Sequence, residues 1–151
     1  MPREENTPKP AALGDFLCFA VYSANLAFGR VYRPILDKLG LTYTQYVTLV
    51  ALSEGDEQRV SDLGDKLFLE SNTLTPILKK LEQLGLVDRR RDAADERQVR
   101  VSLTPAGRKL RHQVAENAST LIEATGLGDD FLKVQQSVAK LRDNLLSSTK
   151  P

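Results

Sequence analysis

The chain has 151 residues, 41% of them hydrophobic and 27% charged, which suits one domain with a modest core. Its net charge of +1 neither favours nor excludes a nucleic-acid partner. No segment approaches the ~18 consecutive apolar residues that a membrane-spanning helix needs, so we expect no membrane partner. One cysteine and one histidine exclude an internal disulfide and a zinc site of the usual kind. We therefore expect a cytoplasmic protein without a metal or other cofactor.

The N-terminal segment differs in composition from the rest of the chain. Residues 1–12, MPREENTPKPAA, are polar and rich in proline, unlike the apolar core of a signal peptide. We expect this segment to be a disordered tail. The remaining residues, 13–151, show no internal repeat and no second domain, so we expect them to form a single domain.

The first half of the domain has the periodicity of helices. Apolar side chains recur every three or four positions over residues 13–31, which predicts a long amphipathic helix. Pro34 is predicted to interrupt that helix, and Gly40 to close a short continuation. Thr42 and Gln45 have the spacing of a capping box, which predicts that another helix begins there.

The middle of the chain predicts two short helices followed by a β-hairpin. One helix begins at Val60, and a second begins near Ser71 to Thr73 and ends at Gly85. Pro76 is predicted to lie in the first turn of the second helix, where its missing N–H has no consequence. Alternating apolar residues over 99–103 predict a returning strand, with an arginine-rich tip before it. This order predicts a mainly α fold with a small β-hairpin wing, a winged helix-turn-helix over residues 42–104.

The last part of the chain is again helical. Thr104 and Pro105 predict the N-cap and first residue of a long helix that continues to Ile122 and is broken at Gly126. Beyond it, Phe131, Val134, Val138, Leu141 and Leu145 recur at three-four spacing, which suits pairing with another helix.

The two central elements present polar and basic side chains that suit double-stranded DNA. A helix in the major groove needs hydroxyls that reach phosphates or bases and lysines that neutralise phosphates, and an arginine at a hairpin tip suits the narrow minor groove. A local ion pair from Asp95 to Arg97 would hold the wing. The alternative is a solvated charged face. The candidate DNA-binding residues are Ser71, Asn72, Thr73, Thr75, Pro76, Lys79, Lys80, Arg89, Arg91, Asp95 and Arg97.

The segment VSDLGDKLFLESNTLTPILKKLEQLGLV, the wing DERQVRVSLT and the following PAGRKL resemble the MarR family of transcriptional regulators. The Asp-x-Arg of the wing is characteristic of that family. The resemblance implies a homodimer that binds a palindromic operator and is assembled from its first and last helices. Here these would be residues 13–40 and 105–148.

The single cysteine, Cys18, lies in the first turns of its predicted helix, where the helix dipole favours a thiolate. Asp15 one turn earlier works against that charge, and small buried packing is the alternative role. Tyr32 lies fourteen residues further on, about 21 Å along a helix. It cannot reach its own Cys18, but it could reach the partner's Cys18 across antiparallel helices, unless it simply packs in an aromatic core.

Residues 16–45, with LCFA, YSA and LDKLGLTY, and the later LTPILKKLE are similar to the OhrR subgroup, which senses organic hydroperoxides. The resemblance implies that Cys18 is oxidised to a sulfenic acid, that Tyr32 and Tyr43 contact its thiolate across the dimer, and that oxidation releases the operator. Members with a second cysteine resolve the sulfenic acid as a disulfide between subunits. This chain resembles the one-cysteine branch, which would need a small-molecule thiol or further oxidation.

The subgroup's usual Asp-Ser-Gly-Thr is replaced here by Glu70-Ser71-Asn72-Thr73, which we expect to preserve the turn.

Three functions remain possible for this sequence: a repressor that senses organic hydroperoxides, a MarR-like repressor gated by a small aromatic ligand, and a thiol peroxidase. The enzyme is the weakest reading because the sequence has no thioredoxin-like βαβ pattern, and we expect no catalytic residues.

Overall fold

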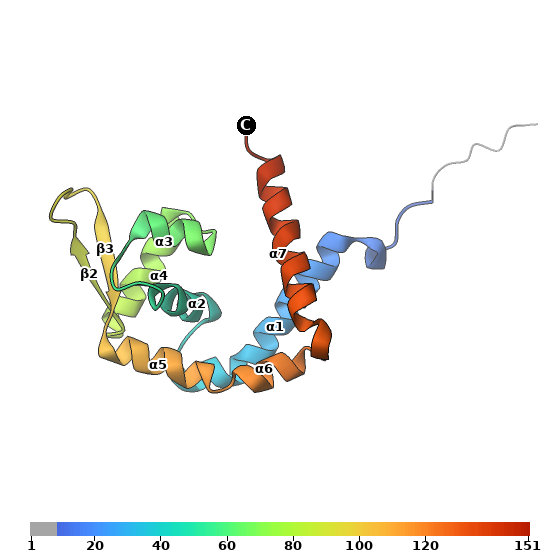
Figure 1. The fold of residues 1–151 in the computed structure, drawn as a ribbon, viewed down its shortest axis with the longest axis horizontal. Helices are drawn as coiled ribbons and strands as arrows, with labels where there is room; N and C mark the ends of the chain where they lie inside the picture. The colour runs from blue at the N-terminus through green and yellow to red at the C-terminus, as the bar shows by residue number, and fades with distance from the viewer. Residues whose placement is uncertain (1–8) are drawn as a thin grey trace, which may run out of the picture.

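The computed structural model describes residues 9–151. Residues 9–12 have no regular structure, and the rest of the predicted tail, residues 1–8, lies outside the described residues. Figure 1 shows the helix-turn-helix and the wing on one side of the molecule, with α1, α6 and α7 on the other. The mainly helical fold with a small antiparallel sheet confirms the predicted winged helix-turn-helix.

The first helix, α1 (Leu17–Leu39), follows a 3-10 turn, η1 (Leu13–Asp15). It continues through Pro34, so the predicted interruption there was wrong. A proline removes only one helical hydrogen bond, here to the carbonyl of Arg30, and both residues are exposed, so water can satisfy that carbonyl. Gly40 ends the helix as predicted, with φ of 69°, and the N–H of Leu41 donates to the Leu36 carbonyl at 3.0 Å.

The second helix, α2 (Tyr43–Leu52), begins with the predicted capping box. The N–H of Gln45 donates to Thr42 Oγ1 at 3.2 Å, and the Thr42 N–H donates to Gln45 Oε1 at 3.0 Å. These two reciprocal bonds satisfy donors that a helix start leaves open. They also fix where Tyr43, the first residue of α2, lies relative to α1.

The helix-turn-helix consists of α3 (Val60–Leu67) and α4 (Ser71–Gln83). Pro76 is the sixth residue of α4, so its predicted place in the first turn was wrong. The carbonyl that loses its donor belongs to Asn72, which is exposed like Pro76 itself, and solvation of that carbonyl makes the proline tolerable. Gly85 follows the helix with φ of 73°, in agreement with its predicted role at the helix end.

The wing is an antiparallel hairpin of β2 (Val87–Arg91) and β3 (Val99–Leu103), in which Arg90 pairs with Arg100. A third strand, β1 (Gln58–Arg59), pairs with the other edge of β3, so the sheet order is β1-β3-β2. The sequence did not predict β1, because two residues cannot display a strand period. The buried Gln58 side chain donates to the Ala51 carbonyl at 2.8 Å, which ties β1 to the end of α2.

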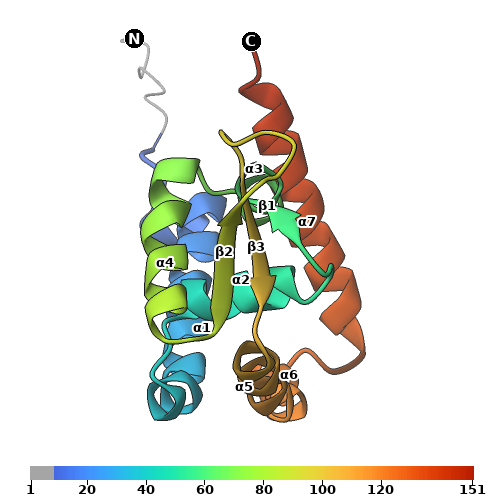
Figure 2. The ribbon, with the colours of Figure 1, turned by 90° about the vertical axis from the view of Figure 1, so that its left-hand side faces the viewer.

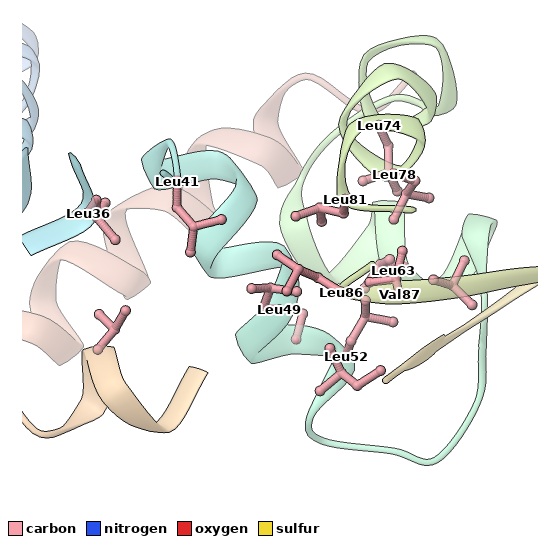
Figure 3. Close-up of a cluster of buried hydrophobic side chains, with 14 residues drawn as sticks. Leu36, Leu41, Leu49, Leu52, Leu63, Leu74, Leu78, Leu81, Leu86 and Val87 are labelled. Carbon is pink, nitrogen blue, oxygen red and sulfur yellow. The ribbon is translucent and has the colours of Figure 1, made fainter. Parts of the chain in front are cut away.

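The core lies where α2, α3, α4 and the sheet meet (Figure 3). Removing one such leucine to alanine typically costs about 2–5 kcal/mol. Gly107 lies in the helix that follows β3. Because it has no Cβ, this helix can pack against the segment before β2, where a Cβ would collide with the Leu86 carbonyl. The fully buried side chains include Leu49, Leu52, Leu63, Leu74, Leu78, Leu81, Val87, Val101 and Val114.

The predicted long helix after the wing is two helices, α5 (Pro105–Ala115) and α6 (Ala118–Ala124), so its predicted continuity was wrong. The Asn117 side chain donates to the Gln113 carbonyl at 3.2 Å. The Asn117 N–H donates instead to Val114, at 3.0 Å, which tightens this turn. The start is as predicted, because Thr104 Oγ1 accepts from the N–H of Gly107 at 3.1 Å.

The chain ends with a 3-10 turn, η2 (Gly128–Asp130), and α7 (Phe131–Ser148). In residues 9–151, no helix combines the length and apolar character needed to cross a membrane. Many large apolar side chains of α1 and α7 are uncovered within one chain. They include Leu17, Phe19, Val21, Leu26, Phe28, Val31, Leu132, Val134, Val138, Leu145 and Leu146.

Candidate DNA-binding surface and cysteine site

The outward face of α4 carries the polar residues that the sequence singled out. Ser71, Asn72 and Thr73 are exposed at its first turn. Thr75 is half-buried, and its Oγ1 donates to the Ser71 carbonyl at 2.7 Å, which leaves its oxygen able to accept. Further along, Pro76, Lys79 and Lys80 are also exposed. This face can therefore offer hydroxyls near its start and positive charge near its middle.

Figure 2 shows α4 beside the β2–β3 hairpin, so the two predicted DNA-binding elements lie on the same side of the molecule. At the tip, the Arg97 side chain is 93% exposed, and its Nε lies 3.4 Å from Asp95 Oδ1. The same carboxylate oxygen accepts the N–H of Arg97 at 3.1 Å. The predicted ion pair is present. Asp95 also holds the backbone of the tip through the Arg97 N–H, while the guanidinium of Arg97 faces solvent.

The arginines of β2 differ from one another. The Nη2 of Arg89 donates to Glu82 Oε1 at 2.9 Å, and the Arg89 side chain is only 22% exposed. Its hydrogen bond and charge hold the pKa of Glu82 below the usual range. Arg89 therefore joins the wing to the recognition helix, whereas Arg91 is exposed. Arg90 pairs with Glu57 at 2.7 Å across the sheet.

Sequence reasoning missed Asp92, which is 5% exposed and directly follows β2, where the loop at the tip of the wing begins. Its Oδ1 accepts the N–H of Ala94 at 2.8 Å, and its Oδ2 accepts Arg100 Nε at 2.6 Å. Arg59 of β1 approaches the same carboxylate at 3.9 Å. The Ala94 N–H and then Arg100 lower the pKa of Asp92. An Asp that accepts a hydrogen bond two residues on is a known turn signal, which could have revealed this position.

Cys18 is the second residue of α1, and it is exposed in one chain. One continuous helix carries both Cys18 and Tyr32, so the structure holds them about 21 Å apart at 1.5 Å per residue. It does bring the two predicted tyrosines together. The ring centroids of Tyr32 and Tyr43 lie 5.1 Å apart with an interplanar angle of 63°.

Tyr32 and Tyr43 line a cavity of about 380 Å³ beside α1, together with Leu26, Arg30 and Arg33. Burial raises the pKa of Tyr32, and the neighbouring tyrosines raise it further. The Tyr32 phenol therefore keeps its proton at neutral pH and can donate a hydrogen bond.

A second cavity, of about 430 Å³, lies between α7 and the helices α1, α2, α5 and α6. Its lining is mainly apolar, with Phe28, Leu121 and Phe131 as examples, and Arg142 is its charged member. Tyr32 and Tyr46 also line it, so the tyrosine cluster stands between the two cavities. In residues 9–151, no group of three His, Cys, Asp or Glu side chains is placed to hold a metal ion.

A polar recognition helix beside an arginine-tipped wing defines the class of this protein, a winged-helix DNA-binding transcriptional regulator. Comparison with known proteins agrees. The sequence profile described as "Transcriptional regulator SarA/Rot" matches residues 30–114, more than half of the chain. The chain is 44% identical over 137 residues to the HTH-type transcriptional regulator TtmR of Methylorubrum extorquens, covering 90% of this chain and 70% of that protein.

The chain is also 36% identical over 142 residues to the organic hydroperoxide resistance transcriptional regulator of Bacillus subtilis, covering 93% and 97% of the two chains. Among solved structures it is similar to reduced AbfR bound to DNA, with a TM-score of 0.76, 36% identity and coverage of 89% and 94%. AbfR is a protein of Staphylococcus epidermidis. The chain belongs to the MarR family of transcriptional regulators, as its helix and wing motifs predicted. The family consists of regulators rather than enzymes.

Proposed function

We propose that this chain is a homodimeric repressor that binds a palindromic operator in double-stranded DNA while Cys18 is reduced. An organic hydroperoxide oxidises Cys18, and a small-molecule thiol completes the change that releases the operator. The observation that best supports redox sensing is the pairing of Tyr32 with Tyr43 beside a cavity. Cys18 of the same chain lies too far along α1 to reach that cavity, so we expect the partner's Cys18 to reach it.

The uncovered apolar faces of α1 and α7 support the homodimer. Side chains such as Leu26, Phe28 and Leu145 are about half exposed in one chain, and a second copy would remove them from water. The proposed dimerisation segments are residues 13–40 and 105–148, with residues 42–104 as the DNA-binding part. A dimer with twofold symmetry presents two α4 helices and therefore fits a palindrome.

The chemistry of the α4 face and the wing supports the DNA contacts. Ser71 and Thr73 can bond to phosphates or base edges in the major groove, and Lys79 can neutralise a phosphate. Arg97, held by Asp95, can enter the minor groove. We assign the contacts to Ser71, Asn72, Thr73, Thr75, Pro76, Lys79, Lys80, Arg91 and Arg97, with Asp95 and Arg89 as supports of the wing.

The redox step has a simple balance. The Cys18 thiolate attacks one oxygen of the hydroperoxide, an S–O bond forms as the O–O bond breaks, and the leaving alkoxide takes a proton to become an alcohol. Cys18 is then a sulfenic acid. A small thiol displaces water from it to give a mixed disulfide, because the chain has no second cysteine. The phenols of the partner's Tyr32 and Tyr43 would donate hydrogen bonds to the thiolate.

Two relatives support a redox input. The Bacillus subtilis relative is named for organic hydroperoxide resistance. AbfR has been solved reduced on DNA, overoxidised on DNA, and with a disulfide formed.

The test is fluorescence anisotropy with a palindrome that the wild-type protein selects from a randomised duplex pool. Wild type and Cys18→Ser are compared with and without cumene hydroperoxide plus a small thiol, at stated salt. We expect both reduced proteins to bind and only wild type to be released. Equal release of Cys18→Ser would overturn the redox mechanism, and failure of both to bind above the level of random duplex would overturn the repressor.

A second candidate is a repressor gated by a small aromatic ligand, with Cys18 as packing. The cavity of about 430 Å³ beside α7 favours it, because its apolar lining and Arg142 suit an aromatic acid. Under this alternative, a small aromatic carboxylate releases Cys18→Ser from DNA as readily as wild type.

A further inference from the structure

Phe68 lies in the turn between the two helices of the helix-turn-helix, in an unusual backbone conformation. It caps α3 with φ of 56° and ψ of 35°, and no other non-glycine residue in the described part of the chain has a positive φ. A bulky residue adopts this left-handed conformation at an energetic cost that glycine or asparagine avoids. Its side chain is 54% exposed, so the ring does not fill the core. A strained aromatic with no core role indicates a specific contact for the ring.

That contact comes from α7. The guanidinium carbon of Arg142 lies 4.4 Å from the centroid of the Phe68 ring, within the range of a cation–π interaction. Arg142 also pairs with its neighbour Asp143, Nη2 to Oδ1 at 2.9 Å, which limits the orientations of the guanidinium. Arg142 lines the cavity beside α7, so it reaches across from that cavity to the helix-turn-helix.

The turn that carries Phe68 is fixed to α3. The N–H of Leu69 donates to the Gly64 carbonyl at 3.0 Å. A Cβ at Gly64 would lie 2.8 Å from the Leu69 carbonyl oxygen, so the turn and the helix are in close backbone contact. Ser71, the first residue of α4, follows three residues after Phe68. A displacement of Phe68 therefore moves the start of α4 rather than being absorbed in a loose loop.

We propose that Arg142 and Phe68 are positioning residues for DNA binding. The terminal helix holds the turn of the helix-turn-helix, and it thereby sets where α4 lies relative to the helices α1 and α7. This inference rests on the proposed dimeric repressor, because the position of α4 matters most when two copies must match two half-sites at once. The interaction between Arg142 and Phe68 sets the spacing of the two α4 helices in the dimer, and neither side chain touches DNA.

The experiment compares Arg142→Ala, Phe68→Leu and the double variant with wild type, using the duplex that wild type selects and the same duplex with one half-site scrambled. We expect each single variant to lose roughly fivefold in affinity for the intact palindrome, with little change on the scrambled duplex. The double variant should lose no more than either single one, since both break one interaction. Arg142→Lys, which keeps a cation, should recover part of the loss.

Hydrogen exchange provides a readout that does not depend on DNA. The amides of residues 68–75 should exchange faster in Arg142→Ala than in wild type, at unchanged thermal midpoint and dimer mass. Independent, additive losses in the two single variants, or equal losses on the intact and scrambled duplexes, would overturn the positioning role. Unchanged exchange in residues 68–75 would overturn the contact itself. If wild type binds no palindrome while exchange responds as expected, the repressor proposal and the positioning role fail but the contact stands.

Discussion

Arg100 Nε lies 2.6 Å from Oδ2 of Asp92, the residue that follows β2, and this contact joins β3 to the start of the loop that carries Asp95 and Arg97. The other oxygen of Asp92 holds the N–H of Ala94 at 2.8 Å. One buried carboxylate therefore fixes both the strand and the start of the tip. The presentation of Arg97 depends on a residue that itself lies away from the exposed surface.

Replacing Asp92 with Asn should weaken DNA binding without dissociating a dimer. The amide is nearly the same size but has no charge for Arg100, so the tip loses its fixed start. We expect roughly a three- to tenfold loss of affinity, as is typical when a hydrogen bond to a charged group is weakened, and a lower thermal midpoint. Anisotropy and thermal unfolding measure the two effects. Asp88→Asn on the exposed side of β2 is the matched control, and an equal loss there would contradict the assignment.

Acid should destabilise the fold through two carboxylates. The pKa values of Asp92 and Glu82 are lowered from 3.8 and 4.5 by their partners. The stabilisation is therefore complete above those values and disappears as the pH falls through the lower folded-state pKa values. We expect the urea midpoint to be nearly constant from about pH 7 to 5 and to fall below about pH 4.

The double variant Glu82→Gln, Asp92→Asn tests this cause. It should start from a lower midpoint at neutral pH and show a shallower fall in acid, because it lacks both groups. A fall as steep as that of wild type would assign the acid sensitivity to other carboxylates.

Arg97→Ala should reduce the dependence of DNA binding on salt. Each arginine that neutralises a phosphate adds about 0.9 to the slope of log affinity against log salt, so a dimer should lose about 2. Release of the DNA in response to peroxide should be unchanged, because Cys18 lies on another part of the chain. Titrations at several salt concentrations measure the slope. Lys133→Ala on α7 is the control, and a slope reduced equally there would argue against a specific role for the wing tip.

Tyr32→Phe and Tyr43→Phe should slow the oxidation of Cys18. Each variant keeps the ring packing but removes a phenol that donates to the partner's thiolate, and we expect a loss of roughly tenfold in rate. The rate is measured by trapping the sulfenic acid with a chemical probe and quantifying the labelled protein by mass spectrometry. Tyr22→Phe removes a phenol from the exposed face of α1 and should leave the rate unchanged. An unchanged rate in both Tyr32→Phe and Tyr43→Phe would contradict a site shared between chains.

Local patterns predicted the elements that depend on local chemistry. The capping box at Thr42, the Thr104 N-cap and the alternation of residues 99–103 each follow from contacts within a few residues, and all were confirmed. The positions at which helices are interrupted were harder to predict. A proline inside a helix can be accommodated by solvation, as at Pro34, and a single asparagine side chain can divide a helix, as at Asn117.

The site shows the same division. The exposed residues of α4 and the Asp95–Arg97 pair could be predicted from the sequence because they lie on one helix face or two residues apart. The pairing of Asp92 with Arg100 and of Arg89 with Glu82 could not, since these partners come from another strand or helix and depend on the sheet register. Cys18, Tyr32 and Tyr43 were grouped by a family resemblance, and one chain brings only the two tyrosines together.

The unbroken course of α1 has a genetic consequence under the proposed sharing of sites between chains. Because Cys18 and Tyr32 lie far apart on one rigid rod, every sensor would be a composite of two polypeptides. A Cys18→Ser chain and a Tyr32→Phe, Tyr43→Phe chain would each form a defective homodimer. Their heterodimer would concentrate all the lesions in one site and leave the other intact. Co-expression of two impaired alleles should therefore give a faster peroxide response than either allele gives alone.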